Sequence, residues 1–164
     1  MTNNHKLESP ECDMMQFPSK KKKAVSVLNL VISISVLVAV TVTTKTEFIL
    51  PPFLATAATK YPDPDWRMNR SVVILFSYVL CSVIGLAFSL LGLHGIIMAS
   101  IASFISFSLC VLMNIEHPPA VLSTFLGVLE RVHLFYIVHP IITGVIIVEG
   151  VNYLLTKYVE PRLG

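Results

Sequence analysis

The stretch His117-Pro-Pro-Ala-Val-Leu-Ser-Thr-Phe125 decides the fold, together with an earlier stretch of the same kind, Pro51-Pro-Phe-Leu-Ala-Thr-Ala-Ala58. Each is a Pro-Pro pair followed by small, hydroxyl-bearing residues, and each lies between hydrophobic segments long enough to cross a bilayer. Proline cannot continue a helix but starts one well, because its fixed φ suits the first turn. Each stretch therefore predicts a break followed by a new helix. Helix N-termini at membrane depth favour anions, so the paired breaks point to a buried polar or anionic site.

The composition is that of an integral membrane protein. Of the 164 residues, 54% are hydrophobic and 13% are charged, and the mean hydropathy is +0.75; soluble domains carry about 25% charged residues. A hydrocarbon core of roughly 30 Å requires about 20 apolar residues per spanning helix. The chain is long enough for one domain with four such windows: residues 24–44, 71–91, 96–113 and 134–155.

The order of these segments predicts an internal repeat. Pro51 and Pro118 occupy equivalent places, and a hydroxyl residue lies four positions after the second proline in each copy, Thr56 and Ser123. We expect an all-α membrane protein with about four transmembrane helices and two Pro-Pro-initiated half-helices, arranged as repeat one (about 24–91) and repeat two (about 96–155). Segments of about a dozen residues are typical of re-entrant helices. Half-helices that dip in and return make the copies parallel; half-helices that cross do not.

The charges flanking the spans predict the orientation. Residues 1–23 hold no apolar run long enough for a signal peptide, so we expect a disordered, basic, cytoplasmic tail. The run Lys20–Lys23 precedes the first span, and Lys157 and Arg162 follow the last. An even number of spans then puts both termini on the cytoplasmic side. Three basic residues between the first two spans argue against this orientation: Lys60, Arg67 and Arg70.

Both Pro-Pro stretches resemble motifs of one family. From about Phe48 to about Leu155 the chain is similar to the HPP family of small integral membrane proteins, so residues 24–160 are identified as an HPP-type transmembrane domain. The family's segments are Pro-Pro-Phe-Gly-Ala-Thr/Ser-Ala and His-Pro-Pro-Ala-Gly-Ala-Thr. Here Leu54 and Val121 replace the two glycines, and Asn114 stands where members commonly carry arginine. Ahead of the second span, a Gln-Pro-Arg-Asn pattern survives only as Arg67 and Asn69.

This resemblance implies transport of a small inorganic anion, with nitrite as the candidate, because some relatives are similar to nitrite transporters of photosynthetic organelles and cyanobacteria. From the residues themselves, the donors for such an anion are N–H groups at the half-helix starts and nearby hydroxyl groups. They suit nitrite, nitrate or formate alike. The candidate substrate-binding residues are Pro51, Pro52, Thr56, His117, Pro118, Pro119, Ser123 and Thr124.

His117 is the sharpest single candidate. Its imidazole titrates near physiological pH and could donate to an anion or pass a proton. The alternative is that His117 only caps the break, with its ring bonded to a backbone carbonyl. His133 and His139 have no fixed helical spacing from His117, so we expect no metal site, and no cofactor is implied.

Three further residues are candidates for gating or coupling. Asn114 and Glu116 end the third span, where they lie at the headgroup level or, if deeper, become functional candidates, because an ionised group in hydrocarbon costs about 2.5 kcal/mol or more. Glu149 falls inside the fourth window, so it should face a partner or a cavity. A structural hydrogen bond to the bundle is the alternative role for Glu149.

Two classes of function stay open: an anion transporter or channel, and a non-transporting membrane scaffold or sensor subunit. We expect no enzyme, because the sequence shows no catalytic constellation. Four spans enclose a polar path poorly, so we expect a homo-oligomer, with small residues such as Gly144 and Gly150 available for helix contacts. The expected partners are the anion and the lipid bilayer, with no nucleic acid, in the plasma membrane of a prokaryote.

Overall fold

The computed structural model describes residues 20–60 and 70–163, and this part of the chain is helical without strands. The helices are α1 (Lys20–Thr44), α2 (Leu50–Thr59), α3 (Ser71–Leu90), α4 (Ile96–Leu112), α5 (Pro118–Leu129) and α6 (Thr143–Leu154). Short helical turns flank them: η1 (Glu47–Ile49), η3 (Leu134–Ile137), η4 (Val138–Ile142), η5 (Leu155–Val159) and η6 (Glu160–Leu163). The all-α prediction is confirmed.

Most of the predicted tail lies outside the described residues, as do Arg67 and Asn69. The last four tail residues, Lys20–Lys23, belong to α1 instead. Lysine has a good helix propensity, so the helix continues beyond the apolar window into the basic run.

Three helical stretches are long and apolar enough to cross a membrane: Lys23–Thr44, Ser71–Leu90 and Leu134–Val159. They correspond to the first, second and fourth predicted windows. The third window is α4, a shorter apolar helix of 17 residues, so the count of four spans stays a prediction. Helices α2 and α5 have 10 and 12 residues, which at about 1.5 Å per residue gives roughly half the thickness of the hydrocarbon core.

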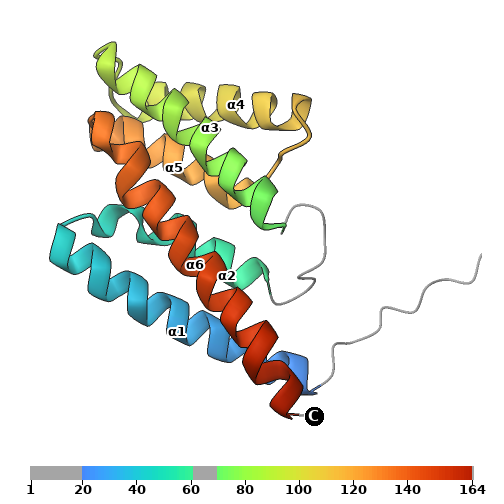
Figure 1. Ribbon diagram of the computed structural model, residues 1–164. Helices are drawn as coiled ribbons and strands as arrows, with labels where there is room; N and C mark the ends of the chain where they lie inside the picture. Colours follow the sequence, from blue (N-terminus) through green and yellow to red (C-terminus); the bar gives the residue numbers. More distant parts are fainter. Residues whose placement is uncertain (1–19, 61–69, 164) are drawn as a thin grey trace, which may run out of the picture.

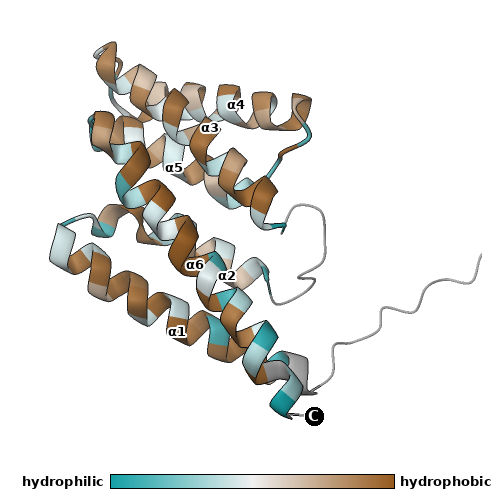
Figure 2. Ribbon diagram, viewed as in Figure 1, coloured by the Kyte–Doolittle hydropathy of each residue, from teal (hydrophilic) through white to brown (hydrophobic). Residues whose placement is uncertain are grey.

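The outer surface of the bundle is apolar, as expected for lipid contact. Figure 2 shows hydrophobic residues along all the helices and polar residues mainly near helix ends. Large apolar side chains are widely exposed, among them Phe104 at 75%, Leu112 at 76% and Leu134 at 72%. Contiguous apolar surface on this scale is not a feature of monomeric soluble proteins. The chain is therefore an integral membrane protein.

Consecutive helices run in opposite directions (Figure 1). Helix α3 packs on α4 and α5, whereas α6 packs on α1 and α2, and the two short helices α2 and α5 contact each other. The third helix of each half of the chain, α3 or α6, therefore packs against the helices of the other half. Helix α1 also contacts η5 and η6, so the two ends of the helical domain lie side by side (Figure 1).

Four helices end in the same local motif, with a left-handed residue directly after the cap. These residues are Lys45, Gly92, Asn114 and Arg131, with φ of 57°, 72°, 56° and 52°. After α4, for example, the Ile115 N–H bonds the Cys110 carbonyl at 3.0 Å and the Asn114 N–H bonds that of Val111 at 3.1 Å. This is the Schellman arrangement, which satisfies the last carbonyls of a helix. It gives Asn114, an exposed residue, a structural task at the end of α4.

Candidate functional site at the Pro-Pro helix starts

The Pro-Pro pairs start α2 and α5 as predicted, but they leave few backbone donors there. Proline has no N–H, and the pairs fill two of the first three positions in each helix. The remaining N–H groups are already bonded, Ala120 to the His117 carbonyl at 2.9 Å and Leu50 to the Glu47 carbonyl. The expected backbone N–H donors are therefore used locally. The helix starts still present the positive ends of their dipoles, and donation to a ligand falls to side chains.

The side chain of Thr56 joins the two Pro-Pro segments. Its Oγ1 lies 2.9 Å from Nε2 of His117, 2.8 Å from the phenol oxygen of Tyr78 and 3.1 Å from the carbonyl oxygen of Pro52. A hydroxyl has one proton and two lone pairs. One arrangement satisfies all three contacts: Thr56 donates to the Pro52 carbonyl and accepts from the phenol and from a protonated Nε2. We call Thr56, Tyr78 and His117 the central cluster.

The central cluster is closed off from its surroundings. Thr56 and His117 are 1% exposed and Tyr78 is fully buried. The Tyr78 ring lies 6.0 Å from the His117 ring and stacks on Phe53 at a centroid distance of 5.0 Å. His117 is the N-cap residue of α5 with extended backbone, and its ring makes no capping bond to that helix. Its Nε2 lies 2.9 Å from the Thr56 hydroxyl, which belongs to the other half of the chain.

The two other predicted hydroxyls lie away from His117. Ser123 Oγ donates to the carbonyl of Ala120 within its own helix at 2.6 Å. Thr124 Oγ1 lies 2.8 Å from Ser106 Oγ on α4 and donates to the carbonyl of Cys81 on α3 at 2.7 Å. These hydroxyls serve helix packing in this conformation, so of the three predicted hydroxyls Thr56 alone joins the central cluster.

A second buried polar group connects α2, α3 and α6. Lys60 Nζ lies 3.0 Å from Oε2 of Glu149, and the same oxygen accepts a hydrogen bond from Ser71. The Lys60 side chain is 4% exposed and that of Glu149 is 12% exposed. Glu149 thus faces a partner, as its place in an apolar span predicts. Glu116 is buried beside His117 in the connection between α4 and α5.

Sequence reasoning missed two of these residues, Tyr78 and Lys60. Tyr78 sits in the middle of an apolar span, where its hydroxyl needs a hydrogen-bond partner once it is buried. Lys60 follows directly after the apolar half-helix α2 and was counted only as a loop charge. Its spacing of four residues from Thr56, which places both on one face of a helix, was the available signal.

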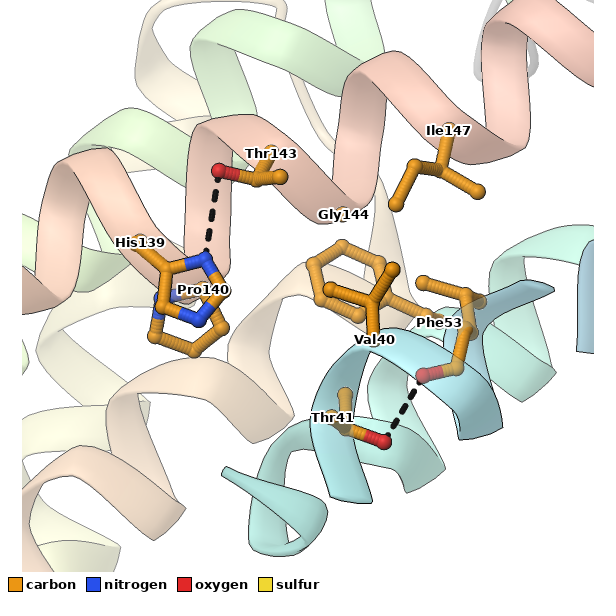
Figure 3. Close-up of a pocket in the computed structure, with 9 residues that line it drawn as sticks. Val40, Thr41, Phe53, His139, Pro140, Thr143, Gly144 and Ile147 are labelled. Atoms are coloured by element: carbon orange, nitrogen blue, oxygen red, sulfur yellow. Dashed lines mark hydrogen bonds between the residues drawn. The ribbon is translucent and has the colours of Figure 1, made fainter. Parts of the chain in front are cut away.

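The described residues also line a small apolar pocket between α1, α2 and α6 (Figure 3). Its free volume is about 10 Å³, the lower limit for one water molecule. The Phe53 ring lies directly against Gly144, and His139 Nδ1 lies 3.4 Å from Thr143 Oγ1 (Figure 3). The residues around it are Leu37, Val40, Thr41, Phe53, His139, Pro140, Thr143, Gly144 and Ile147. This pocket borders the packing of Phe53 rather than the central cluster.

A comparison with protein families gives one match. The family model described as "HPP, transmembrane region" matches residues 15–162, which is most of the chain and includes both Pro-Pro segments. No curated protein and no solved structure matches the chain.

Proposed function

The chain belongs to the HPP transmembrane family, and on that premise we propose that it carries a small inorganic anion, with nitrite as the candidate, past the Pro-Pro half-helix starts. One observation carries the proposal. The imidazole of His117, at the start of α5, meets the Thr56 hydroxyl of α2 at 2.9 Å, in the buried interior of an apolar bundle. Polar groups inside membrane segments are costly and usually mark a substrate or ion path.

The position of this contact supports transport over simple packing. Helix α3 packs on α4 and α5, helix α6 packs on α1 and α2, and α2 contacts α5. Successive helices alternate in direction (Figure 1). We interpret this as two repeats of inverted topology, with α2 and α5 crossing part of the membrane rather than returning. Transporters with inverted repeats bind substrate near the midplane, at interrupted helices where the repeats meet. The Thr56–His117 contact lies at that junction.

The chemistry of the central cluster suits a monovalent anion. The imidazole of His117, the phenol of Tyr78 and the hydroxyl of Thr56 can each donate a hydrogen bond. In the proposed mechanism an entering anion displaces Thr56 from the His117 and Tyr78 donors and takes its place as acceptor. The positive dipole end of α5 favours the negative charge. Ser123 and Thr124 bond the carbonyls of Ala120 and Cys81 and do not contact the anion in this mechanism.

The alternative is a non-transporting membrane scaffold or sensor subunit. It is favoured by the closed state of the central cluster, in which the Thr56 hydroxyl already has three hydrogen-bond neighbours. If these bonds serve packing alone, their removal lowers the stability of the protein instead of blocking a path.

Uptake by liposomes separates the two functions. Purified protein is reconstituted, and uptake of nitrite is compared with nitrate, formate and chloride. We expect saturable nitrite uptake that Thr56→Val and His117→Ala abolish while both variants stay folded in detergent. The matched controls are Thr43→Val and His133→Ala, because these two residues are exposed and their loss should leave uptake unchanged. Absence of flux for every anion, from folded and inserted protein, rejects transport. Loss of folded protein in both central variants supports a scaffold.

Orientation and assembly complete the proposal. We propose that both ends of the helical domain lie on the cytoplasmic side of the membrane; the contacts of α1 with η5 and η6 and the basic run Lys20–Lys23 support this orientation. We propose a homo-oligomer in the plasma membrane of a prokaryote. Cross-linking in native membranes tests the assembly, and labelling of introduced cysteines at positions 20 and 162 from either side tests the orientation.

A further inference from the structure

The ion pair of Lys60 and Glu149 lies outside the central cluster and is unusual in a membrane domain. Lysine and glutamate are almost never buried unless they are paired, and each is expensive inside the bilayer. Here the ammonium and the carboxylate meet at 3.0 Å with both side chains nearly buried. Lys60 caps the C-terminal end of α2, and Ser71 begins α3. The pair therefore lies where the half-helix of the first repeat ends.

The two oxygens of the Glu149 carboxylate are used unequally. Oε2 receives both Lys60 and Ser71, whereas Oε1 is buried with no hydrogen-bond partner among the described residues. A buried acceptor without a partner raises the cost of the ionised carboxylate. Protonation at Oε1 would remove that charge and leave Oε2 in contact with its two donors.

The pair is connected to the central cluster along one face of α2. Lys60 follows Thr56 by four residues, which puts the two side chains one above the other. Thr59 Oγ1 donates to the Thr56 carbonyl at 2.8 Å, so the backbone between them is held. Helix α2 thus carries two buried polar contacts, one from Thr56 to His117 and one from Lys60 to Glu149.

We propose that Lys60 and Glu149 form a proton-linked anion site, in which protonation of Glu149 lets a small monovalent anion replace its carboxylate beside the Lys60 ammonium. In the resting state one positive and one negative charge lie together. In the loaded state the neutral carboxylic acid, the ammonium and the anion lie together. One proton and one anion enter, so the net charge of the buried site is unchanged, and no other co-reactant is needed. The inference rests on the proposed function for the identity of the anion.

Few other titratable groups face Glu149 from the described elements around α6. Helix α2 contributes Lys60, and Tyr78 on α3 lies within electrostatic reach of the carboxylate. Arg70 and Lys23, on the ends of α3 and α1, are exposed, and Lys157 on η5 binds the Tyr153 hydroxyl instead. From η4, His139 lies at the apolar pocket. Among the described elements, the charged group that contacts the Glu149 carboxylate is therefore Lys60.

Binding in detergent tests the inference apart from transport. The midpoint of thermal unfolding is measured with and without sodium nitrite at several pH values, at constant ionic strength, with sodium sulfate as the salt control. We expect nitrite to stabilise the wild type increasingly as the pH falls. Glu149→Gln mimics the protonated acid, so nitrite should stabilise it equally at every pH. Lys60→Gln and the Lys60→Gln/Glu149→Gln double variant should lose the effect. Glu47→Gln and Lys157→Gln, at exposed positions, are the matched controls and should behave like wild type.

Uptake by liposomes provides the second measurement. For one proton moved with one anion, an inward gradient of one pH unit should drive roughly tenfold accumulation of nitrite. Protein-free liposomes correct for permeation of the neutral acid. Glu149→Gln should carry nitrite to equilibrium but lose this accumulation. The Lys60→Gln/Glu149→Gln double variant leaves no unpaired charge in the buried site. If it stays folded but does not bind nitrite, the loss of binding results from the missing ammonium and not from unfolding.

The outcomes distinguish the two proposals. If wild type transports nitrite, and nitrite stabilises Glu149→Gln with the same pH dependence as wild type, the inference is overturned and the proposed function stays intact. If nitrite stabilises the wild type more as the pH falls, this effect is lost in Lys60→Gln, and the liposomes show no flux, the site is supported and transport is overturned. Absence of nitrite stabilisation in the folded wild type at every pH overturns the site directly.

Discussion

Gly144 is the position at which one methyl group tests the tertiary structure most directly. A Cβ built on Gly144 would lie 2.3 Å from two ring atoms of Phe53 and 2.9 Å from a third. Phe53 is fully buried and stacks on Tyr78, which bonds Thr56. The ring cannot turn aside without disturbing the central cluster. Gly144→Ala should therefore push α6 away from α2 and loosen the site as well.

The size of this effect follows from two opposing terms. Overpacking a well-filled core costs about 1–3 kcal/mol, and replacing glycine by alanine in a helix returns up to about 1 kcal/mol. We expect Gly144→Ala to lose about 1–2 kcal/mol. At this chain length that corresponds to a melting midpoint roughly 2–8 °C below wild type. Gly150 lies in the same helix with nothing within 4 Å of its Cβ position, so Gly150→Ala should gain up to about 1 kcal/mol.

Thermal unfolding of the purified protein in detergent, followed by the folded fraction on size exclusion, measures both variants under one condition. Phe53→Leu provides a double-mutant cycle. The smaller side chain makes room for the new methyl group, so the two substitutions together should cost less than their sum, by about 0.5–3 kcal/mol. Equal stability of Gly144→Ala and Gly150→Ala would refute the close approach of α2 and α6. Strict additivity with Phe53→Leu would assign the loss to some other contact.

Three further predictions concern helix contacts and helix ends. A Cβ on Gly85 would meet the Cα and the carbonyl oxygen of Thr124 at 3.1 Å. Gly85→Ala should therefore separate α3 from α5 and lower the free energy of unfolding by about 1–3 kcal/mol. Thermal unfolding measures this loss, and stability at or above wild type would contradict the packing of α3 on α5. Asn114→Gly should keep or raise stability, because glycine adopts the left-handed conformation without strain, whereas Asn114→Val should lower it by at least about 1 kcal/mol; equal effects in the same unfolding assay would reject the left-handed cap. Asn29→Ala removes the 3.2 Å hydrogen bond to Asn152 between α1 and α6 and should lower the free energy of unfolding by about 0.6 kcal/mol. Adding Asn152→Ala should cause no additional loss of stability. An additive loss would show that the two amides do not interact.

The positions of the helices could be predicted from the sequence to within a few residues. Hydropathy marks the spans because a bilayer selects apolar length, and Pro-Pro marks the two helix starts because proline acts locally on its own backbone. Helix α1 begins four residues before its expected apolar window, at Lys20, because hydropathy alone does not see helix propensity. The backbone donors expected at the helix starts are absent or already bonded, since the prolines that start the helices also remove N–H groups.

The candidate site shows the limit of sequence reasoning. His117 and Thr56 were both identified, but their pairing joins residues 61 positions apart, and no local pattern predicts it. Ser123 is the counterpart of Thr56 in the repeat, yet its hydroxyl bonds its own helix. A threonine or serine in a helix can always bond a carbonyl of the preceding turn, so its type does not reveal whether it faces a partner.

The sequence by itself determined that the protein is an all-helical membrane protein of the HPP family and that its helices break at two Pro-Pro pairs. Hydropathy and backbone stereochemistry act over a few residues, and both can be evaluated without knowing any contact. Only the tertiary structure decided that Thr56 faces His117 and Tyr78, and that Lys60 reaches Glu149, 89 residues away. The rotation of each helix about its axis depends on close contacts with its neighbours, such as those at Gly85 and Gly144, and such contacts exist only after the chain has packed.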